Sequence, residues 1–463
     1  MRSLRHSNRD GGFRTHLRET TLLAIPVSIG QLGHVMLGVT DSVMVGRLGE
    51  VPLAAASLGH GVFVLMLVFA IGICSALTPL TAIADGGGDH SRAATTFRHA
   101  LFLNFVVGGL LVLFTWLIAD VLTVLKQPPA VVALTGPYLR IMGFSFLPMT
   151  IFLTFRNFIE GLSFTKPAMV AILLANVVNV FGNWLLIYGN LGMPALGLRG
   201  AGYSSVAVEL FAAIALTVYV LRAPSFRRYH PMLHFPRLDR AVLSRLLRIG
   251  LPSGLQYIFE AGSFTFSAVM IGWLGATALA AHQIALNLAS VSFMITLGIA
   301  HAATIRVGNA VGREDRAAVR MAGFSAVTMG MTLMGCAAIS FIALRDVLPA
   351  LYIDDTAVRQ LAGQLLVLAA IFQLSDGAQV VGHGLLRGMT DVTVPMFIAL
   401  GAYWVIGVPA SYLLAFVAGF GAPGVWMGFV LGLSTAAVSF LLRFHLHSRQ
   451  SFGPNRDRRA GVA

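Results

Sequence analysis

Long apolar runs alternate with short polar breaks along most of the chain. The breaks carry most of the arginines, and the apolar runs reach the roughly 20 residues that a helix needs to cross a bilayer. The pattern therefore predicts an all-α protein with twelve transmembrane helices. The expected spans are residues 22–45, 53–80, 99–125, 133–155, 167–188, 203–222, 248–271, 279–305, 321–344, 360–386, 395–417 and 422–444.

The composition also indicates a polytopic membrane protein, one whose chain crosses the bilayer repeatedly. Hydrophobic residues make up 57% of the chain and charged residues only 11%, whereas soluble domains carry about 25% charged residues. Residues 1–19 are too polar for the apolar core of a secretory signal, and the run after them is long enough to remain as a span. We therefore expect the chain to be embedded in a lipid bilayer.

The formal net charge of +13 comes mainly from arginines, and their distribution along the chain predicts which side of the membrane the termini occupy. Basic residues lie in the N-terminal segment, in every second loop and after the last span, and such residues mark the cytoplasmic side of a membrane. Both termini are therefore predicted to be cytoplasmic. Because the arginines flank apolar runs, anchoring accounts for them better than nucleic-acid binding, and no nucleic-acid partner is expected.

Two halves of six spans each resemble one another. The stretch "GRLGEVPLAAAS" (46–57) matches "GWLGATALAAHQ" (272–283), and Pro252 follows Pro26 at the same offset of 226 residues. Further matching stretches occur in the same order, so the sequence predicts two pseudo-symmetric six-helix bundles. A six-helix repeat returns the chain to its starting side, which relates the bundles by an axis along the membrane normal. That arrangement is typical of transporters that work by alternating access.

One long basic linker separates the two halves, and we expect the chain to act as a monomer. The predicted parts are a cytoplasmic N-terminal segment (1–20), a first six-helix lobe (21–222), a basic cytoplasmic linker (223–246), a second six-helix lobe (247–445) and a cytoplasmic tail (446–463).

Four acidic residues fall inside predicted spans, namely Asp41, Glu209, Glu260 and Asp376. A carboxylate in the bilayer costs about 3 kcal/mol on insertion scales, so such residues usually face a cavity and bind cations or protons. Glu260 and Asp376 lie in the same half, where no Lys or Arg is predicted at a comparable depth. Two carboxylates could bind a monovalent cation such as Na⁺ or share a proton. A structural hydrogen bond or ion pair is the alternative.

A second polar group is predicted in the first half. Asn179 and Asn183 are four residues apart and share a helix face, and Asp41 lies in the first span. Amides inside a membrane often serve only to join helices, which is the competing interpretation. Glu209 is open in the same way, because it could face a cavity of the first lobe or extend towards an interface.

The sequence lacks the motifs of catalysis. It has no P-loop, Gly-rich phosphate cradle, metal-ligand cluster or nucleophile elbow. His383 lies seven residues from Asp376, but no nucleophile accompanies the two. We therefore expect no enzymatic activity and no cofactor beyond a coupling ion.

Four stretches carry a resemblance to a known family. The sequence resembles the multidrug and toxic compound extrusion (MATE) transporters, in their bacterial NorM-type branch, over residues 15 to 445. The stretches are "TDSVMVGRLG" (40–49), "NVFGNWLLIYGNLGMPALGLRGAG" (179–202), "AAHQIALNLASVSFMITLGIAHAATIRVGNAVG" (280–312) and "LSDGAQVVGHGLLRGMTDVTVP" (374–395).

The resemblance implies a multi-pass protein of the bacterial inner membrane that exports cationic amphiphiles in exchange for inward Na⁺ or H⁺. By motif match, it implies that Glu260 and Asp376 bind the coupling cation, as a Na⁺ site or a proton site. Gln283 and Phe372 would lie beside that pocket. The residues matching the family's polar cluster of the N-terminal lobe, implicated in protonation and the drug response, are Asp41, Asn179 and Asn183.

One departure bears on the coupling ion. The family often has tyrosine one turn before the acid of the tenth helix, where this chain has Phe372. Phenylalanine keeps a ring face for cation–π contact but lacks the hydroxyl, so Na⁺ and H⁺ both stay open. The rival function is a flippase for lipid-linked or amphiphilic substrates with the same two-bundle architecture.

Overall fold

The computed structural model describes residues 12–122, 128–229 and 238–449. Over these residues the secondary structure is helical and contains no strand, which confirms the predicted all-α class. The α-helices are α1 (Phe13–Gly46), α2 (Glu50–Cys74), α3 (Leu77–Gly86), α4 (His90–Val121), α5 (Pro129–Gly143), α6 (Phe146–Gly161), α7 (Lys166–Tyr188), α8 (Leu198–Arg222), α9 (Arg240–Gly272), α10 (Ala276–Gly312), α11 (Arg316–Ala343), α12 (Thr356–Gly388), α13 (Thr393–Leu400), α14 (Val408–Tyr412) and α15 (Ala422–His447).

Each predicted span coincides with a helix or with a broken helix of the described residues. Ten helical segments there are long and apolar enough to cross a membrane, and the bent pair α5–α6 makes an eleventh if it counts as one span. The seventh predicted span, α9, is 33 residues long but is not among them. Its polar residues Gln256 and Glu260 lower its hydropathy, as expected of a helix that carries a site.

Two predicted spans, 53–80 and 133–155, are not continuous helices. The first breaks between α2 and α3, near Ser75, and the second bends by 40° between α5 and α6, near Phe144. Proline lacks a backbone N–H, and its ring clashes with the carbonyl four residues earlier. Pro79 and Pro148 lie four residues after these two positions, so each break has a cause in the sequence.

The ends of some helices extend beyond the apolar runs. α1 begins at Phe13 and α9 at Arg240, whereas the spans were predicted from 22 and 248. The last part of the predicted linker 223–246 therefore belongs to α9, and its first part contains the 3₁₀ turn η3 (Pro224–Tyr229). A helix can continue into polar residues at the membrane surface. Hydropathy marks only the part of the helix that lies inside the bilayer, so it does not locate the end of the helix.

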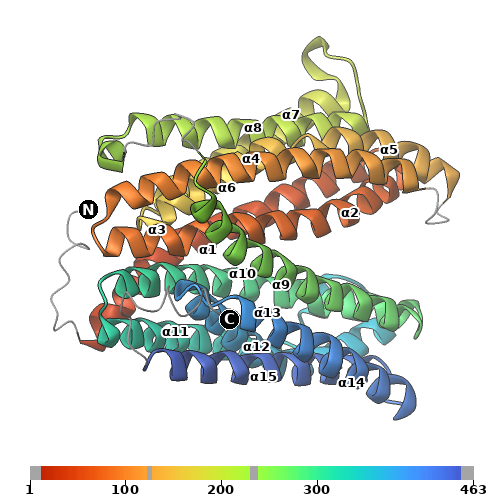
Figure 1. Cartoon of the computed structure of the whole chain (residues 1–463). Helices are drawn as coiled ribbons and strands as arrows, with labels where there is room; N and C mark the ends of the chain where they lie inside the picture. Colours follow the sequence, from red (N-terminus) through yellow and green to blue (C-terminus); the bar gives the residue numbers. More distant parts are fainter. Residues whose placement is uncertain (1–11, 123–127, 230–237, 450–463) are drawn as a thin grey trace. The chain divides into compact units, whose positions relative to one another are not determined.

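The chain forms two compact units, each with its own packing (Figure 1). Unit 1 contains Met1–Ser28, Ala82–Gly88 and Leu255–Ala463, and in it α12 packs against α10, α11 and α15. Unit 2 contains Ile29–Thr81 and Asp89–Gly254, with α6 against α4 and α8. The predicted lobe limits 21–222 and 247–445 stay a prediction.

The backbone repeats unusual conformations at matching positions of the two halves. Gly49 and Gly275 precede α2 and α10 with φ of 114° and 108°. Ser163 and Thr390, which follow α6 and α12, have φ of 68° and 59°, values that side chains other than Gly seldom adopt. These pairs lie 226 and 227 residues apart. The duplicated sequence therefore folds into duplicated local structure.

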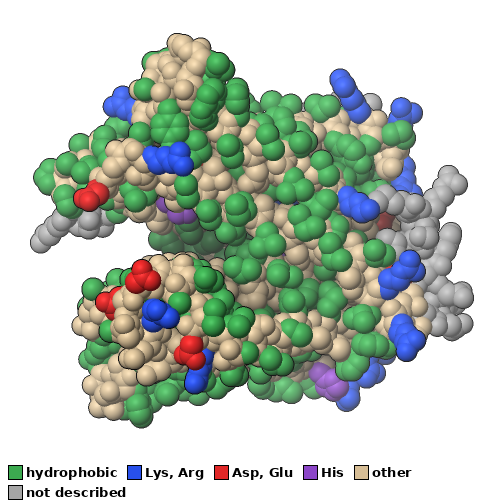
Figure 2. All heavy atoms as spheres, turned by 180° about the vertical axis from the view of Figure 1, so that it is seen from behind, with side chains coloured by type: hydrophobic (Ala, Val, Ile, Leu, Met, Phe, Trp, Pro, Cys, Tyr) green, Lys and Arg blue, Asp and Glu red, His purple; other side chains and the backbone are tan. Residues whose placement is uncertain are grey.

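The surface of the protein matches a lipid environment. Figure 2 shows hydrophobic side chains over most of the visible face, with Lys and Arg side chains mainly towards its ends. A soluble protein exposes charged residues throughout its surface. The membrane-embedded character predicted from hydropathy is confirmed.

Candidate functional site

Unit 1 brings together the two acids predicted to bind a cation. Asp376 of α12 is 2% exposed, and Glu260 of α9 is close enough for the two charges to interact. In the described part of the chain, neither carboxylate forms an ion pair with Lys, Arg or His. Asp376 is buried, whereas Glu260 is partly exposed. Two neighbouring carboxylates without a basic partner repel one another, so the pair favours an added cation or proton.

Two further residues belong to this cluster and were not predicted. Gln379, one turn after Asp376, lies beside Glu260, and Tyr403 lies beside Gln379 and within the electrostatic reach of both acids. Gln379 is 1% and Tyr403 4% exposed. Helical spacing from Asp376 was a signal that could have found Gln379. Tyr403 is on another helical segment, and the sequence offers no comparable signal for it.

Phe372 and Gln283 differ in how they relate to the acids. The Phe372 ring is 3% exposed and packs against Trp426 and Phe429, with ring centroids 5.5 and 6.2 Å away. It is therefore part of an aromatic cluster one turn before Asp376. Gln283 lies on an exposed part of α10 and, among the described residues, has no hydrogen bond to either acid.

A second buried polar group follows along α12. Arg387 is 2% exposed and donates hydrogen bonds to the Tyr257 hydroxyl at 2.9 Å and to Thr304 Oγ1 at 3.5 Å. The His383 ring packs against Tyr257, with centroids 5.9 Å apart. The charged guanidinium thus has neutral partners, and within the described chain no carboxylate pairs with it.

Unit 2 assembles the polar group predicted in the first half. Asp41 Oδ1 accepts hydrogen bonds from Asn179 Nδ2 at 2.8 Å and Asn183 Nδ2 at 2.6 Å, and Ser205 Oγ donates to Asp41 Oδ2 at 3.4 Å. The Oδ1 atoms of both asparagines are buried and have no hydrogen-bond partner within the described residues. The cluster therefore holds one carboxylate and two free amide oxygens.

Glu209 of α8 lies apart from these bonds. Its Oε2 is buried and, in the described residues, accepts no hydrogen bond. The structure gives it no hydrogen bond to Asp41 within that same part of the chain.

Unit 2 also contains a buried ion pair near the end of α6. Arg156 Nε donates to Glu160 Oε1 at 2.8 Å, and Arg156 Nη2 donates to Gln31 Oε1 at 2.9 Å. The two charged side chains are 8% and 1% exposed. His34 of α1 lies one turn after Gln31 and packs against Phe152 of α6, with centroids 6.1 Å apart.

The chemistry of the acid pair suits a small, hard cation. Over the described residues there is no cluster of three or more His, Cys, Asp and Glu side chains that could hold a transition metal. Carboxylate, amide and hydroxyl oxygens are instead the ligands of hard cations. The residues around Glu260 and Asp376 therefore fit a proton or a monovalent ion such as Na⁺.

Comparison with known proteins assigns the chain to a family. The sequence pattern of the MatE family matches residues 26–185 and 252–413. The chain belongs to the MatE family. The two matches begin 226 residues apart, at the offset of the internal repeat, so this MatE chain carries the family's pattern once in each half.

Curated relatives and a solved structure agree with this assignment. A probable multidrug resistance protein NorM of Rhizobium meliloti (strain 1021) is 36% identical over 440 residues, covering 94% of each chain. A probable NorM of Rhodopseudomonas palustris (strain ATCC BAA-98 / CGA009) is 36% identical over 447 residues, covering 96% of this chain and 94% of its own. A MOP superfamily transporter from Pyrococcus furiosus has the same fold, with a TM-score of 0.85 at 20% identity, over 94% of this chain and 96% of its own. The predicted family is confirmed.

Proposed function

We propose that the protein is a multidrug exporter of the bacterial inner membrane that exchanges cationic amphiphiles for inward Na⁺ or H⁺. The relatives named as probable multidrug resistance proteins support the drug-efflux part. The acid pair of unit 1 carries the proposal of ion coupling, because Glu260 lies close to the buried Asp376 and neither has a basic partner in the described chain.

The proposed mechanism is competition between the coupling cation and the drug. A cation that enters from outside binds Glu260 and Asp376 and stabilises the conformation with low affinity for drug. A drug molecule from the cytoplasm stabilises the other conformation, since a ligand shifts such an equilibrium only through its different affinity for the two states. Both termini are cytoplasmic in this proposal, and the two conformations open to opposite sides of the membrane.

The concentration gradient of the coupling ion supplies the energy. The membrane potential adds about 2.3 kcal/mol per 100 mV for each positive charge that enters beyond those that leave with the drug. Neutralising the paired carboxylates lets the ion cross a region where bare charges are costly. Inward cation movement therefore drives outward movement of drug.

Ethidium efflux from proteoliposomes tests this function. The purified full chain is reconstituted, and efflux is followed by fluorescence under a Na⁺ gradient alone and under a pH gradient alone. A response to Na⁺ alone assigns Na⁺ to the acid pair, and a response to pH alone assigns protons to it. Efflux that responds to neither gradient contradicts the antiport proposal and favours the flippase alternative.

A further inference from the structure

An aromatic ring occupies the position one helical turn before Asp376. Position 372 is phenylalanine, and its ring is enclosed by Phe264, Trp426 and Phe429. A ring in that setting can offer no lone pair to a cation. A cation that leaves water must find oxygens to replace its hydration shell. Two carboxylates and Gln379 supply some of them, so another donor is expected nearby.

Tyr403 has the properties of that donor. Its side chain is 4% exposed, and its hydroxyl has no hydrogen-bond partner at normal geometry within the described residues. It nevertheless lies beside Gln379 and within the electrostatic reach of Glu260 and Asp376. A buried hydroxyl without a partner costs free energy and requires an explanation. A cation bound between the hydroxyl and the acids would satisfy that hydroxyl.

The local backbone holds Tyr403 in this place. It lies in η5 (Gly401–Gly407), a π-helical segment between α13 and α14, and π-helical turns occur frequently at functional sites. Trp404 Nε1 donates to the carbonyl of Phe259 at 2.9 Å, which joins η5 to the turn of α9 that carries Glu260. Trp404 follows Tyr403 in the sequence and Phe259 precedes Glu260, so this hydrogen bond connects the backbone segments that carry Tyr403 and Glu260.

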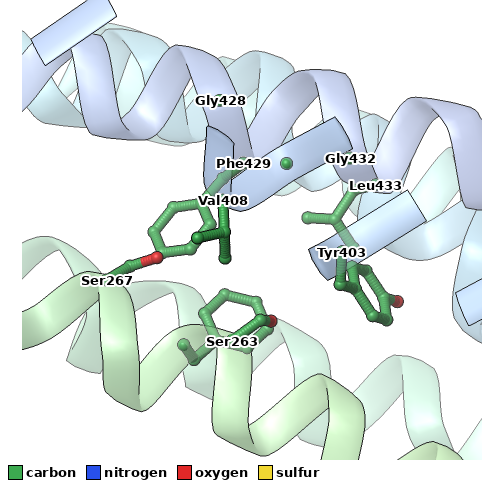
Figure 3. Close-up of a pocket in the computed structure, with 10 residues that line it drawn as sticks. Ser263, Ser267, Tyr403, Val408, Gly428, Phe429, Gly432 and Leu433 are labelled. Atoms are coloured by element: carbon green, nitrogen blue, oxygen red, sulfur yellow. The ribbon is translucent and has the colours of Figure 1, made fainter. Parts of the chain in front are cut away.

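Small residues allow η5 to approach α15 closely. A Cβ added at Gly432 would lie 3.0 Å from the carbonyl oxygen of Ala402 and 3.2 Å from the Cα of Gly407. Figure 3 shows the narrow pocket beside this contact, with the Tyr403 ring at one end and its hydroxyl directed away from Val408 and Phe429. The hydroxyl therefore does not serve the apolar pocket that its ring lines.

We propose that Tyr403 is a ligand of the coupling cation and that its hydroxyl supplies an oxygen that the ring of Phe372 does not offer. Gln379, whose Oε1 is also buried without a partner in the described residues, provides a further neutral oxygen. The cation is Na⁺, because a neutral hydroxyl and an amide oxygen add ligands for a metal ion that a shared proton does not need. This inference rests on the proposed function.

Direct binding of ²²Na⁺ to the purified full chain tests the proposal. Tyr403→Phe removes only the hydroxyl and is expected to weaken Na⁺ binding about tenfold or more, as for the loss of one contact to a charge. Tyr412→Phe is the matched control, because Tyr412 lies in the same predicted span but is 48% exposed. It is expected to bind Na⁺ as the parent does. Ethidium binding by each variant reports whether the protein is folded.

A second variant tests the exchange of positions. Phe372 precedes Asp376 by one helical turn on the same face, so the double variant Tyr403→Phe with Phe372→Tyr restores a hydroxyl to the cluster. It is expected to regain most of the lost affinity. A double variant that binds Na⁺ no better than Tyr403→Phe contradicts the replacement of one hydroxyl by the other.

Asp376→Asn separates failure of this inference from failure of the proposed site. If Asp376→Asn loses Na⁺ binding while Tyr403→Phe equals the parent, the acid site stands and Tyr403 is not a ligand. If neither variant changes Na⁺ binding, the acid site itself is wrong. A parent protein that binds no Na⁺ but exports ethidium under a pH gradient overturns the role of Tyr403 and leaves the antiport proposal intact.

Discussion

The two repeats place opposite chemistry at equivalent positions. His34 of α1 and Glu260 of α9 are equivalent, because each follows its helix proline, Pro26 or Pro252, by eight residues. Counting back from Ser163 and Thr390, Arg156 and Glu160 correspond to His383 and Arg387, and Met149 corresponds to Asp376. The first repeat therefore has an ion pair and a histidine where the second has two acids followed by two bases.

The reverse holds about two turns further along α1 and α9. Asp41 corresponds to Ser267, which follows Pro252 by the same fifteen residues as Asp41 follows Pro26. Asp41 is bound by Asn179 and Asn183, whereas Ser267 lines a narrow pocket and its hydroxyl has no partner in the described residues. Among the described residues, the second repeat therefore has unpaired acids at Glu260 and Asp376, and the first repeat has one at Asp41. At each of these positions the other repeat has a residue that is not acidic.

The two repeats differ in whether their acidic residues have a basic partner. Arg156 and Glu160 neutralise one another, so the first repeat has no net charge there for a cation to balance. Glu260 and Asp376 are left without such a partner in the described chain, and an added cation lowers their repulsion. Under the proposed function, we therefore expect the coupling cation at Glu260 and Asp376 and not at the equivalent positions of the first repeat.

Removing one acid of the pair is expected to have the largest effect. Asp376→Asn should reduce gradient-driven ethidium efflux to the level of empty liposomes, because one carboxylate alone no longer favours the cation strongly. Met149→Leu, at the equivalent position of the first repeat, should leave efflux unchanged. Efflux at the parental rate from Asp376→Asn, with the protein folded, would contradict the assignment of the pair.

Breaking the ion pair of the first repeat should lower stability instead. Glu160→Gln leaves Arg156 buried without its counter-charge, and removing one partner of a buried pair costs about 3 to 5 kcal/mol. Thermal unfolding in detergent, followed by size-exclusion chromatography, measures the loss.

The equivalent position of the second repeat provides the contrast. Arg387→Gln removes a charge whose described partners are the neutral hydroxyls of Tyr257 and Thr304. The expected cost is about 1 to 3 kcal/mol, smaller than for Glu160→Gln. An equal loss in both variants would show that Arg387 is paired as Arg156 is.

The acid of the first repeat should affect transport without affecting Na⁺ binding in the second. Asp41→Asn removes the charge that Asn179 and Asn183 hold by hydrogen bonds, and efflux is expected to fall roughly fivefold or more, as is typical when one of two coupled sites is lost. Binding of ²²Na⁺ should stay within about twofold of the parent. A loss of Na⁺ affinity as large as that of Asp376→Asn would place both acids in one site.

Hydropathy predicted the membrane class and located a helix or a broken helix at each expected span, because the bilayer imposes length and apolarity on each helix. Within the described chain, ten or eleven of these segments are long and apolar enough to cross a membrane. Hydropathy did not predict the breaks at Ser75 and Phe144, although Pro79 and Pro148 record them. The equivalent positions of the second repeat lack these prolines, and there α10 and α12 are continuous. Reading the prolines against the repeat would have found the breaks.

The candidate site residues were predictable where a carboxylate lies in an apolar run or where helical spacing places polar residues on one face. Asp41, Glu260 and Asp376 are conspicuous because a carboxylate in an apolar run is costly, and helical spacing brought in Asn179 and Asn183. Tyr403 was missed, because tyrosine is common in membrane helices and its position depends on the π-helical turn and on packing against α15. Such tertiary contacts leave no periodic signal in one sequence.

The smallest effect is expected at Ser267, the counterpart of Asp41. Its hydroxyl is buried without a partner in the described residues, so Ser267→Ala removes an unsatisfied group and should be neutral or stabilising by up to about 1 kcal/mol. Ethidium efflux and Na⁺ binding should both equal those of the parent. If Ser267→Ala impairs efflux while its thermal stability is unchanged, the pocket that Ser267 lines takes part in transport. The equivalent positions Asp41 and Ser267 would then both be functional, one with an acidic and the other with a neutral side chain.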